Sequence, residues 1–364
     1  MRVAGFCQDP SACTAIRIAH PLRRIKALGL ADVDLIESGD QSAPEKCFGA
    51  NVVMLGRAAG DNVLRIMRKV QEGGGKVVYD LDDNYFEVSP CAQEYKSFGI
   101  MPINMDAPDG RSIALHRDGE GGFDIRRNRK FRKNFIDALR LADVVTVTTE
   151  PLQREYMRFN DNVRLVPNAV DFSVWEKPPI RWNHDEVRLL YTGAANHQED
   201  FFFIKDVLQG LQEKYRNLRI VFIGTDWKII NNGLDYSRVE YHPWVHVEAY
   251  PHLLKSLCCD IGIAPISKTK FNDARSALKW KEYSALKIAT VATGYGPYKR
   301  RINDGVTGLL VDTKEEWFAA LSRLIEDEPF RSRLAMNAYN VCKFKHNLDF
   351  VVDDWMRVFK GVMA

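Results

Sequence analysis

Residues 260–293 read DIGIAPISKTKFNDARSALKWKEYSALKIATVAT, and this stretch decides the predicted fold. Apolar runs at 260–265 and 288–293 have the length and composition of buried strands, while residues 275–287 show the apolar spacing of a helix. A strand, a helix and a second strand in this order are typical of a parallel sheet with crossover connections. The stretch therefore predicts an α/β fold.

The same alternation extends through the rest of the second half. Strands are predicted at 187–191 and 218–223, and helices at 199–215 and 249–257. From Lys314 onward the sequence predicts only helices, at 314–327, 329–342 and 347–362.

The first half shows this alternation too, with predicted strands at 3–7, 51–56, 76–80, 143–149 and 163–170. Helices are predicted at 20–28 and at 61–72, the second capped by Asp61 and ended by three glycines at 73–75. The segment 84–123, rich in Pro, Gly, Asp and Met, is longer than a compact connection normally is. Two Rossmann-like, doubly wound parallel-sheet lobes result, at 1–174 and 187–345, joined by a linker at 175–186.

Length and composition agree with a two-lobed globular protein. The 364 residues, 46% hydrophobic and 27% charged, correspond to about two domains of ~150 residues. The chain contains no apolar run long enough for a membrane span and no secretory signal pattern, so a cytoplasmic location is expected. Its seven cysteines lack metal-ligand spacing, which predicts reduced, mostly buried thiols.

The net charge of +3 is too small to indicate nucleic-acid binding by itself. The densest basic cluster is at 126–133, where helical spacing places four cations on one face: Arg126, Arg129, Lys130 and Lys133. Such a face suits a phosphate-bearing acceptor, and it is equally typical of a solvated helix surface.

Ligands of open parallel sheets bind beyond the carboxyl ends of the strands. After the strand at 76–80 come three carboxylates within four residues, those of Asp80, Asp82 and Asp83. They suit a divalent cation, a base for a sugar hydroxyl, or a cap for the next segment.

A second turn of this kind lies at 193–200, where small residues open onto a helix. The free amides of such a helix start favour an anion, and His197 adds a possible donor, although a plain strand-to-helix turn has the same pattern.

The richest group of polar residues lies at 268–283. Asn272 or Asp273 is predicted to cap a helix that starts near Ala274 and presents Ser276, Lys279 and Tyr283 on one face, with Glu282 one turn beyond Lys279. This arrangement suits a nucleoside diphosphate, and an amphipathic surface helix with a Lys279–Glu282 pair is the alternative. The loop at 294–298 follows the next strand, and its Tyr298 is placed to cover a base or a sugar.

These residues resemble the GT-B class of nucleotide-sugar-dependent glycosyltransferases, in particular a retaining bacterial and phage-type subset. The second-lobe motif of that class matches Lys279 to Tyr283 and the strand around 307–311. The subset also has a Gly…His…Asp turn, matched by Gly193, His197 and Asp200, and a strand ending in Asp-x-Asp-Asp, matched at 80–83. Its Phe-Asn…Arg-Ser…Lys…Glu-Tyr pattern is matched by Phe271, Asn272, Arg275, Ser276, Lys279, Glu282 and Tyr283.

The resemblance implies transfer of a sugar from a nucleotide diphosphate sugar, with UDP as the expected nucleotide, to an acceptor hydroxyl, with retention and without a required metal or other cofactor. The donor is expected in the second lobe and the acceptor in the first, with the terminal helix at 346–364 crossing back to the first lobe.

The resemblance also implies roles for individual residues. Glu282 is expected on the ribose, Lys279 and Arg275 on the diphosphate, and Asp82 and Asp83 at the reacting sugar or acceptor hydroxyl. The expected catalytic group is Asp82, Asp83, Lys279 and His197. The expected donor-binding group is Arg17, Gly193, Asn272, Arg275, Ser276, Lys279, Glu282, Tyr283 and Tyr298.

The acceptor stays open between a surface glycan, a lipid-linked sugar and a base of phage-type DNA, and the basic face at 126–133 would allow contact with an anionic membrane or with nucleic acid. Two departures from the family pattern bear on activity. Ala274 stands where the broader family has a Glu, and the turn at 193–200 lacks the usual Arg and Lys. A non-catalytic nucleotide-sugar-binding module therefore stays as an alternative. A metal-dependent transferase that uses Asp80, Asp82 and Asp83 is a third possibility.

Overall fold

The computed structural model describes residues 1–7, 9, 11–90, 92, 94–106, 112–176, 185–193, 198–224 and 233–364. These residues form two compact units. Unit 1 comprises Met1–Pro167 and Val351–Ala364, and unit 2 comprises Asn168–Phe350. The chain therefore passes between the units twice, at 167–168 and at 350–351, while residues 177–184 of the predicted linker at 175–186 lie outside the described residues.

Unit 1 is built on a parallel sheet in the order β2-β1-β3-β4-β7-β8. Its strands are β1 (Arg2–Cys7), β2 (Asp32–Glu37), β3 (Val52–Gly56), β4 (Lys76–Leu81), β7 (Val144–Val147) and β8 (Val163–Leu165). All residues of β7 and most of β3 and β4 are buried, as expected for central strands that are covered on both faces. The predicted strands of this half are confirmed, whereas the edge strand β2 was not predicted because acidic residues interrupt its apolar pattern.

Helices connect these strands. They are α1 (Ala12–Thr14), the π-helical turn η1 (Ala15–Ala19), α2 (His20–Ala27), α3 (Ala43–Phe48), α4 (Asp61–Glu72), α6 (Ile125–Leu141) and α7 (Glu150–Tyr156). The bounds of α4 are as predicted, but Gly60 and not Asp61 is its N-cap residue. The C-terminal helix α17 (Leu348–Met363) packs in unit 1 from Val351 onward.

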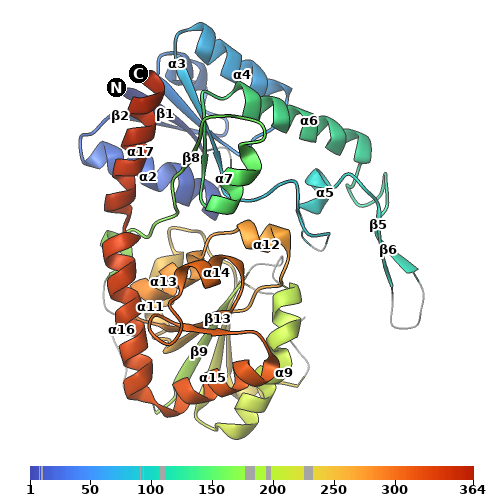
Figure 1. The fold of residues 1–364 in the computed structure, drawn as a ribbon, viewed down its shortest axis with the longest axis vertical. Helices are drawn as coiled ribbons and strands as arrows, with labels where there is room; N and C mark the ends of the chain where they lie inside the picture. The colour runs from blue at the N-terminus through green and yellow to red at the C-terminus, as the bar shows by residue number, and fades with distance from the viewer. Residues whose placement is uncertain are drawn as a thin grey trace. The chain divides into compact units, whose positions relative to one another are not determined.

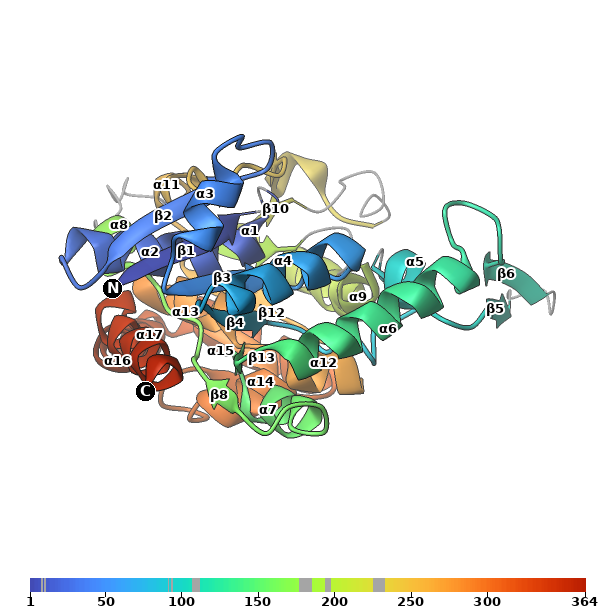
Figure 2. The same cartoon turned by 90° about the horizontal axis from the view of Figure 1, so that it is seen from above.

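The long segment at 84–123 contains a short helix, α5 (Tyr95–Phe98), and an antiparallel hairpin of β5 (Ile103–Asp106) and β6 (Ser112–His116). The hairpin lies beyond the start of α6 and away from the sheet of its own unit in both views (Figures 1 and 2). At its base Asn128 of α6 is fully buried and donates to the carbonyls of Lys96 and Gly99, at 2.9 and 2.8 Å. This contact attaches the segment to α6.

Unit 2 has a second parallel sheet, in the order β11-β10-β9-β12-β13-β14. Its strands are β9 (Val187–Thr192), β10 (Leu218–Ile223), β11 (Val239–His242), β12 (Ile261–Ala264), β13 (Ala289–Thr293) and β14 (Leu309–Val311). The four central strands match the predicted ones, and β11 was missed because this edge strand is mostly half-exposed.

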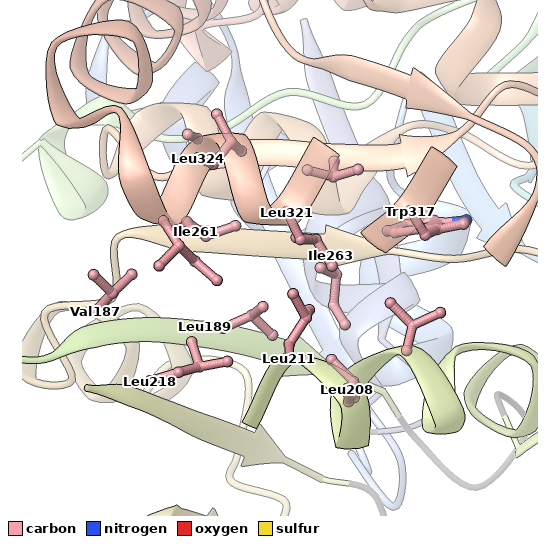
Figure 3. Packing of buried hydrophobic residues seen from close by; sticks show 14 of the residues in the cluster. Val187, Leu189, Leu208, Leu211, Leu218, Ile261, Ile263, Trp317, Leu321 and Leu324 are labelled. Atoms are coloured by element: carbon pink, nitrogen blue, oxygen red, sulfur yellow. The ribbon is translucent and has the colours of Figure 1, made fainter. Parts of the chain in front are cut away.

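The helices of unit 2 are α8 (Phe172–Trp175), the 3₁₀ turn η3 (Tyr236–Arg238), α9 (Gln198–Lys214), α11 (Tyr250–Ser256), α12 (Lys270–Ala274), α13 (Leu278–Ala285), α14 (Gly296–Arg301), α15 (Lys314–Glu326) and α16 (Glu328–Lys345). One face of the sheet packs on α9 and α15. Figure 3 shows Leu208 and Leu211 of α9 and Leu321 of α15 converging on Leu189 and Ile263 of the strands, and all five are fully buried. This core holds the strands whose carboxyl ends carry the candidate site.

Three local predictions in unit 2 differ from the structure. The helix predicted at 275–287 is present as α13, but it begins only at Leu278 because Arg275 is extended, and residues 270–274 form the separate short helix α12. Thr269, and not Asn272 or Asp273, caps α12. The predicted flexible loop at 294–298 is instead the start of α14, where Pro297 occupies the first helical turn.

Candidate functional site

The candidate site of unit 2 centres on α13, which follows β12 at the carboxyl edge of the sheet. Lys279 and Glu282 are three residues apart on α13 and are therefore neighbours on the helix surface. The Lys279 ammonium lies 5.6 Å from the ring centre of Tyr191 in β9, which is a cation–π geometry. Glu282 is 8% exposed, whereas Lys279 is partly exposed.

The electrostatics of this pair are unusual. Burial and, to a smaller extent, the nearby Arg275 guanidinium lower the pKa of Lys279 to about 8, against the opposing effect of the Asp200 and Glu282 carboxylates. Burial raises the pKa of Glu282 to about 8, although Lys279 and a hydrogen bond with Tyr250 oppose this shift. At pH 7 the pair therefore carries about one positive charge, because both side chains are mostly protonated.

These pKa values predict a strong pH dependence of anion binding. Between pH 7 and 9 Lys279 loses its charge and Glu282 gains one, so the site changes from net positive to net negative. We expect the affinity for UDP, measured by titration calorimetry, to fall above pH 8 by up to about tenfold per pH unit for each proton released. Lys279→Arg should show a shallower fall. An affinity that is constant from pH 7 to 9 would contradict these protonation states.

Other predicted residues form hydrogen bonds in the segments next to α13. Asn272 donates to the carbonyl of Ser267 at 2.9 Å, and Ser276 accepts from the side chain of Asn168 at 2.9 Å. Asp200 accepts from the backbone and hydroxyl of Ser267, at 2.7 and 2.9 Å. The loop before α12 is thus connected to the start of α9. Gly193 donates its amide to Ile223 at 3.0 Å, which extends the pairing of β9 with β10.

Tyr283 and Tyr298, both expected to bind the donor, are buried side chains. Tyr283 is fully buried, its ring lies against Gly262, and its hydroxyl shares a 2.9 Å hydrogen bond with Thr192. Tyr298 is 4% exposed and packs in a hydrophobic cluster with Trp280 and Ile302. Both side chains are thus buried within unit 2, and their contact with the donor stays a prediction. His197, expected to be catalytic, lies outside the described residues.

Sequence reasoning missed two contributors, Tyr250 and Thr192. Tyr250 begins α11, which follows β11, and its hydroxyl interacts with both Thr192 and Glu282. The signal was available, because Tyr250 comes soon after a strand on the same sheet edge, but β11 itself was not predicted.

In unit 1 the first of the three predicted carboxylates is structural. Asp80 and Arg17 form a bidentate pair with distances of 2.6 and 2.9 Å, and their side chains are 2% and 4% exposed. Thr146 also donates to Asp80, at 2.6 Å, and Arg17 donates to the carbonyl of Val166 at 2.8 Å. Arg17 therefore has a structural role in unit 1, and its contact with donor phosphates stays a prediction.

Asp82 and Asp83 are partly exposed beyond β4 and face a polar cluster that the sequence did not indicate. Arg57 follows β3 with a left-handed φ of 24° and donates to Asp9 and Ser11, at 2.9 Å each. Asp82 accepts from Tyr85 at 3.2 Å, and its charge together with burial raises the pKa of Cys13. The strained backbone of Arg57 marks this edge as a candidate site as well.

The four predicted cations of α6 are all exposed on its surface, as expected. Two of them are paired: Lys130 lies 2.6 Å from Asp61, and Lys133 lies 2.7 Å from Asp137. Arg126 and Arg129 are the members of this face that stay available to a phosphate, since neither forms an ion pair within the described part of the chain.

Metal and thiol chemistry have little support at these positions. Over the described ranges, no three His, Cys, Asp or Glu residues are grouped so that they could hold a metal ion. The six cysteines that the structure describes are free thiols, of which Cys47, Cys259 and Cys342 are buried. Within the same described ranges, none of the helices is long and apolar enough to cross a membrane.

Comparison with solved structures decides the fold. HepE from Anabaena, in complex with UDP-glucose, is similar over 99% of this chain and 100% of its own, with a TM-score of 0.66 and 12% identity. Sucrose-phosphate synthase from Thermosynechococcus elongatus covers 100% of this chain and 99% of its own, with a TM-score of 0.65 and 12% identity. The chain has the GT-B fold of glycosyltransferases.

Two further comparisons refine this result. Residues 175–341 of the GT-B chain match the family described as "Glycosyl transferases group 1". TarM from S. aureus, in a complex that contains UDP, is similar with a TM-score of 0.59 and 13% identity over 85% of this chain, which spans about 55% of TarM. No curated protein matches the GT-B chain by sequence.

Proposed function

We propose that this protein transfers a sugar from a UDP-sugar or a related nucleotide diphosphate sugar to an acceptor hydroxyl, with retention at the anomeric carbon. The observation that carries this proposal is the pair of Lys279 and the buried Glu282, with Arg275 beside it, at the carboxyl edge of the unit 2 sheet. The match to the glycosyltransferase family covers all three residues.

The pair suits the two polar parts of a nucleotide diphosphate sugar. The ammonium of Lys279 and the guanidinium of Arg275 supply positive charge in a site with little water, where charge stabilisation is strongest. They would hold the diphosphate and stabilise it as it leaves. Glu282, held by Tyr250, is placed to hydrogen-bond ribose hydroxyls. HepE and TarM, whose structures contain UDP, support the choice of nucleotide.

Unit 1 would bind the acceptor. Asp82 and Asp83 are partly exposed at its sheet edge, where carboxylates can accept the proton of a hydroxyl or stabilise positive charge at the reacting sugar carbon. Arg126 and Arg129 on α6 would contact phosphates of the acceptor, whether it is a lipid-linked sugar, a surface glycan or DNA. Salt-dependent binding of duplex DNA, compared with binding to anionic vesicles, separates these acceptors.

The test of the proposed reaction is a panel of nucleotide sugars. We expect one of them, a UDP-sugar, to raise the melting temperature and to be slowly hydrolysed, with the sugar released first in its original anomeric form, as proton NMR reports. Binding without any transfer or hydrolysis would favour a non-catalytic nucleotide-sugar-binding module. This alternative is suggested by Ala274, which replaces the Glu of the family. Loss of activity with a chelator would favour a metal-dependent transferase.

Substitution of Glu282 tests the ribose contact. We expect Glu282→Ala to weaken UDP binding by about 1–3 kcal/mol, because ribose hydroxyls and the Tyr250 hydroxyl lose a partner in a buried site. Glu282→Gln should weaken it less, since Glu282 is mostly protonated at pH 7 and the amide keeps similar hydrogen bonds. Titration calorimetry measures both variants, and unchanged affinity in Glu282→Ala would exclude Glu282 from the donor site.

A further inference from the structure

The two chain segments that cross between the units are joined to each other within unit 2. Immediately after the first crossing, the amide of Val170 donates to the carbonyl of His346 at 2.9 Å, and the amide of Leu348 donates to Val170 at 3.0 Å. Val170 and Asn347 accordingly form an isolated parallel bridge. The backbone near one crossing is therefore hydrogen-bonded to the backbone near the other.

A buried lysine connects this structure to α13. Lys281 is 2% exposed, and its ammonium donates to the carbonyl of Asn168 at 2.6 Å. Asn168 is the first residue of unit 2. Burial of a charge is costly unless the charged group is hydrogen-bonded, so the folded state strongly favours this contact between Lys281 and Asn168. Lys281 stands between Lys279 and Glu282 in the sequence but projects from another side of the helix.

Asn168 makes a second contact, at the start of the same helix. Its side-chain amide donates to the hydroxyl of Ser276 at 2.9 Å, in the non-helical link between α12 and α13. Asn168 thus holds the link before α13 with its side chain and the middle of α13 with its carbonyl. Both Asn168 and Lys281 are buried, and neither is in the proposed donor contacts.

The other side of α13 is packed on the segment before the second crossing. Trp280 stacks edge-on against His346 with ring centres 5.8 Å apart, and Cys342 of α16 contacts the carbonyl of Lys281 at 3.4 Å. Residues flanking both crossings therefore contact the one helix that carries Lys279 and Glu282.

We propose that Asn168 and Lys281 are positioning residues that couple the donor helix α13 to the crossing segments, so that occupancy of the donor site changes the backbone at 168–170 and 346–348. The identity of the ligand in this inference rests on the proposed function. The contacts of Asn168 and Lys281 are present without a ligand.

Hydrogen exchange of the full chain tests the coupling without a ligand. In Asn168→Ala and Lys281→Met we expect faster amide exchange, by about fivefold or more, both in α13 and at Val170 and Leu348, with the core strands β9 and β10 unchanged. Asn337→Ala and Lys299→Met are the matched controls, since Asn337 also donates a side-chain amide to a carbonyl and Lys299 is exposed. Faster exchange throughout unit 2, or at the crossing segments alone, overturns the proposal.

Addition of UDP supplies the second part of the test. In the wild-type protein UDP should slow exchange in α13 and at Val170 and Leu348, whereas in Asn168→Ala it should slow exchange in α13 only, with UDP affinity within about threefold. Equal protection of the crossing segments in both proteins overturns the coupling. If UDP leaves α13 of the wild-type protein unaffected, the proposed donor site is wrong, and the measurement without ligand still decides the role of Asn168 and Lys281.

Discussion

Lys279→Ala is expected to lower turnover by about 100- to 1,000-fold, the loss that follows removal of one group stabilising charge that develops in a transition state. As the nucleotide diphosphate leaves, its negative charge grows next to the Lys279 ammonium and the Arg275 guanidinium. Because burial surrounds the ammonium with little water, its interaction with that charge is strong. Steady-state kinetics with the preferred donor measure the effect.

The same substitution should leave stability unchanged or raise it. Burial lowers the pKa of Lys279, which means that the folded protein holds this charge at a cost. Because Glu282 is mostly protonated at pH 7, removal of the Lys279 ammonium leaves no uncompensated buried charge on its partner. Lys299→Ala on α14 removes an exposed lysine and should change neither property. A large fall in melting temperature with normal turnover would show that Lys279 is structural.

The α/β architecture could be predicted because each central strand is an apolar run bounded by clear turn signals. In β9, β12 and β13 every residue is buried, so the hydrophobic pattern is continuous and unambiguous. The edge strands β2 and β11 are partly exposed, and their mixed patterns do not differ from those of loops. The non-helical link between α12 and α13 at Arg275 was not predicted, since no Pro or Gly marks it in the sequence. This link is stabilised by tertiary contacts such as the hydrogen bond between Asn168 and Ser276.

The candidate site was predictable where its chemistry is local. Lys279 and Glu282 are helical neighbours, and their spacing alone places them together. Burial was not predictable from spacing: Tyr283 shares a face with Lys279, yet it is completely enclosed against Gly262. Contacts between distant segments were equally hidden. Nothing in the sequence pairs Tyr250 with Glu282, or Arg57 with Asp9, until the strands place their carboxyl ends at one edge.

Arg17→Met is expected to destabilise the protein by about 3–5 kcal/mol, the cost of leaving a buried charge without its partner. The π-helical turn at Ala15–Ala19 places Arg17 where it bonds Asp80 of β4 and the carbonyl after β8, and its guanidinium lies 5.1 Å from the ring centre of Trp355 in α17. Loss of this side chain leaves Asp80 with only the Thr146 hydroxyl among the hydrogen bonds described above. Urea denaturation monitored by circular dichroism measures the change.

A second substitution separates loss of charge pairing from loss of packing. Asp80→Asn removes the charge that Arg17→Met leaves uncompensated, so the double variant should be more stable than Arg17→Met alone. Lys130→Met is the exposed control: its ion pair with Asp61 has side chains 66% and 68% exposed, and its removal should cost less than about 1 kcal/mol. If the destabilisations by Arg17→Met and Asp80→Asn simply add, the Arg17–Asp80 pair stabilises the fold by packing and not by charge compensation. The contact of Arg17 with Trp355 would then account for the attachment of α17 to β4.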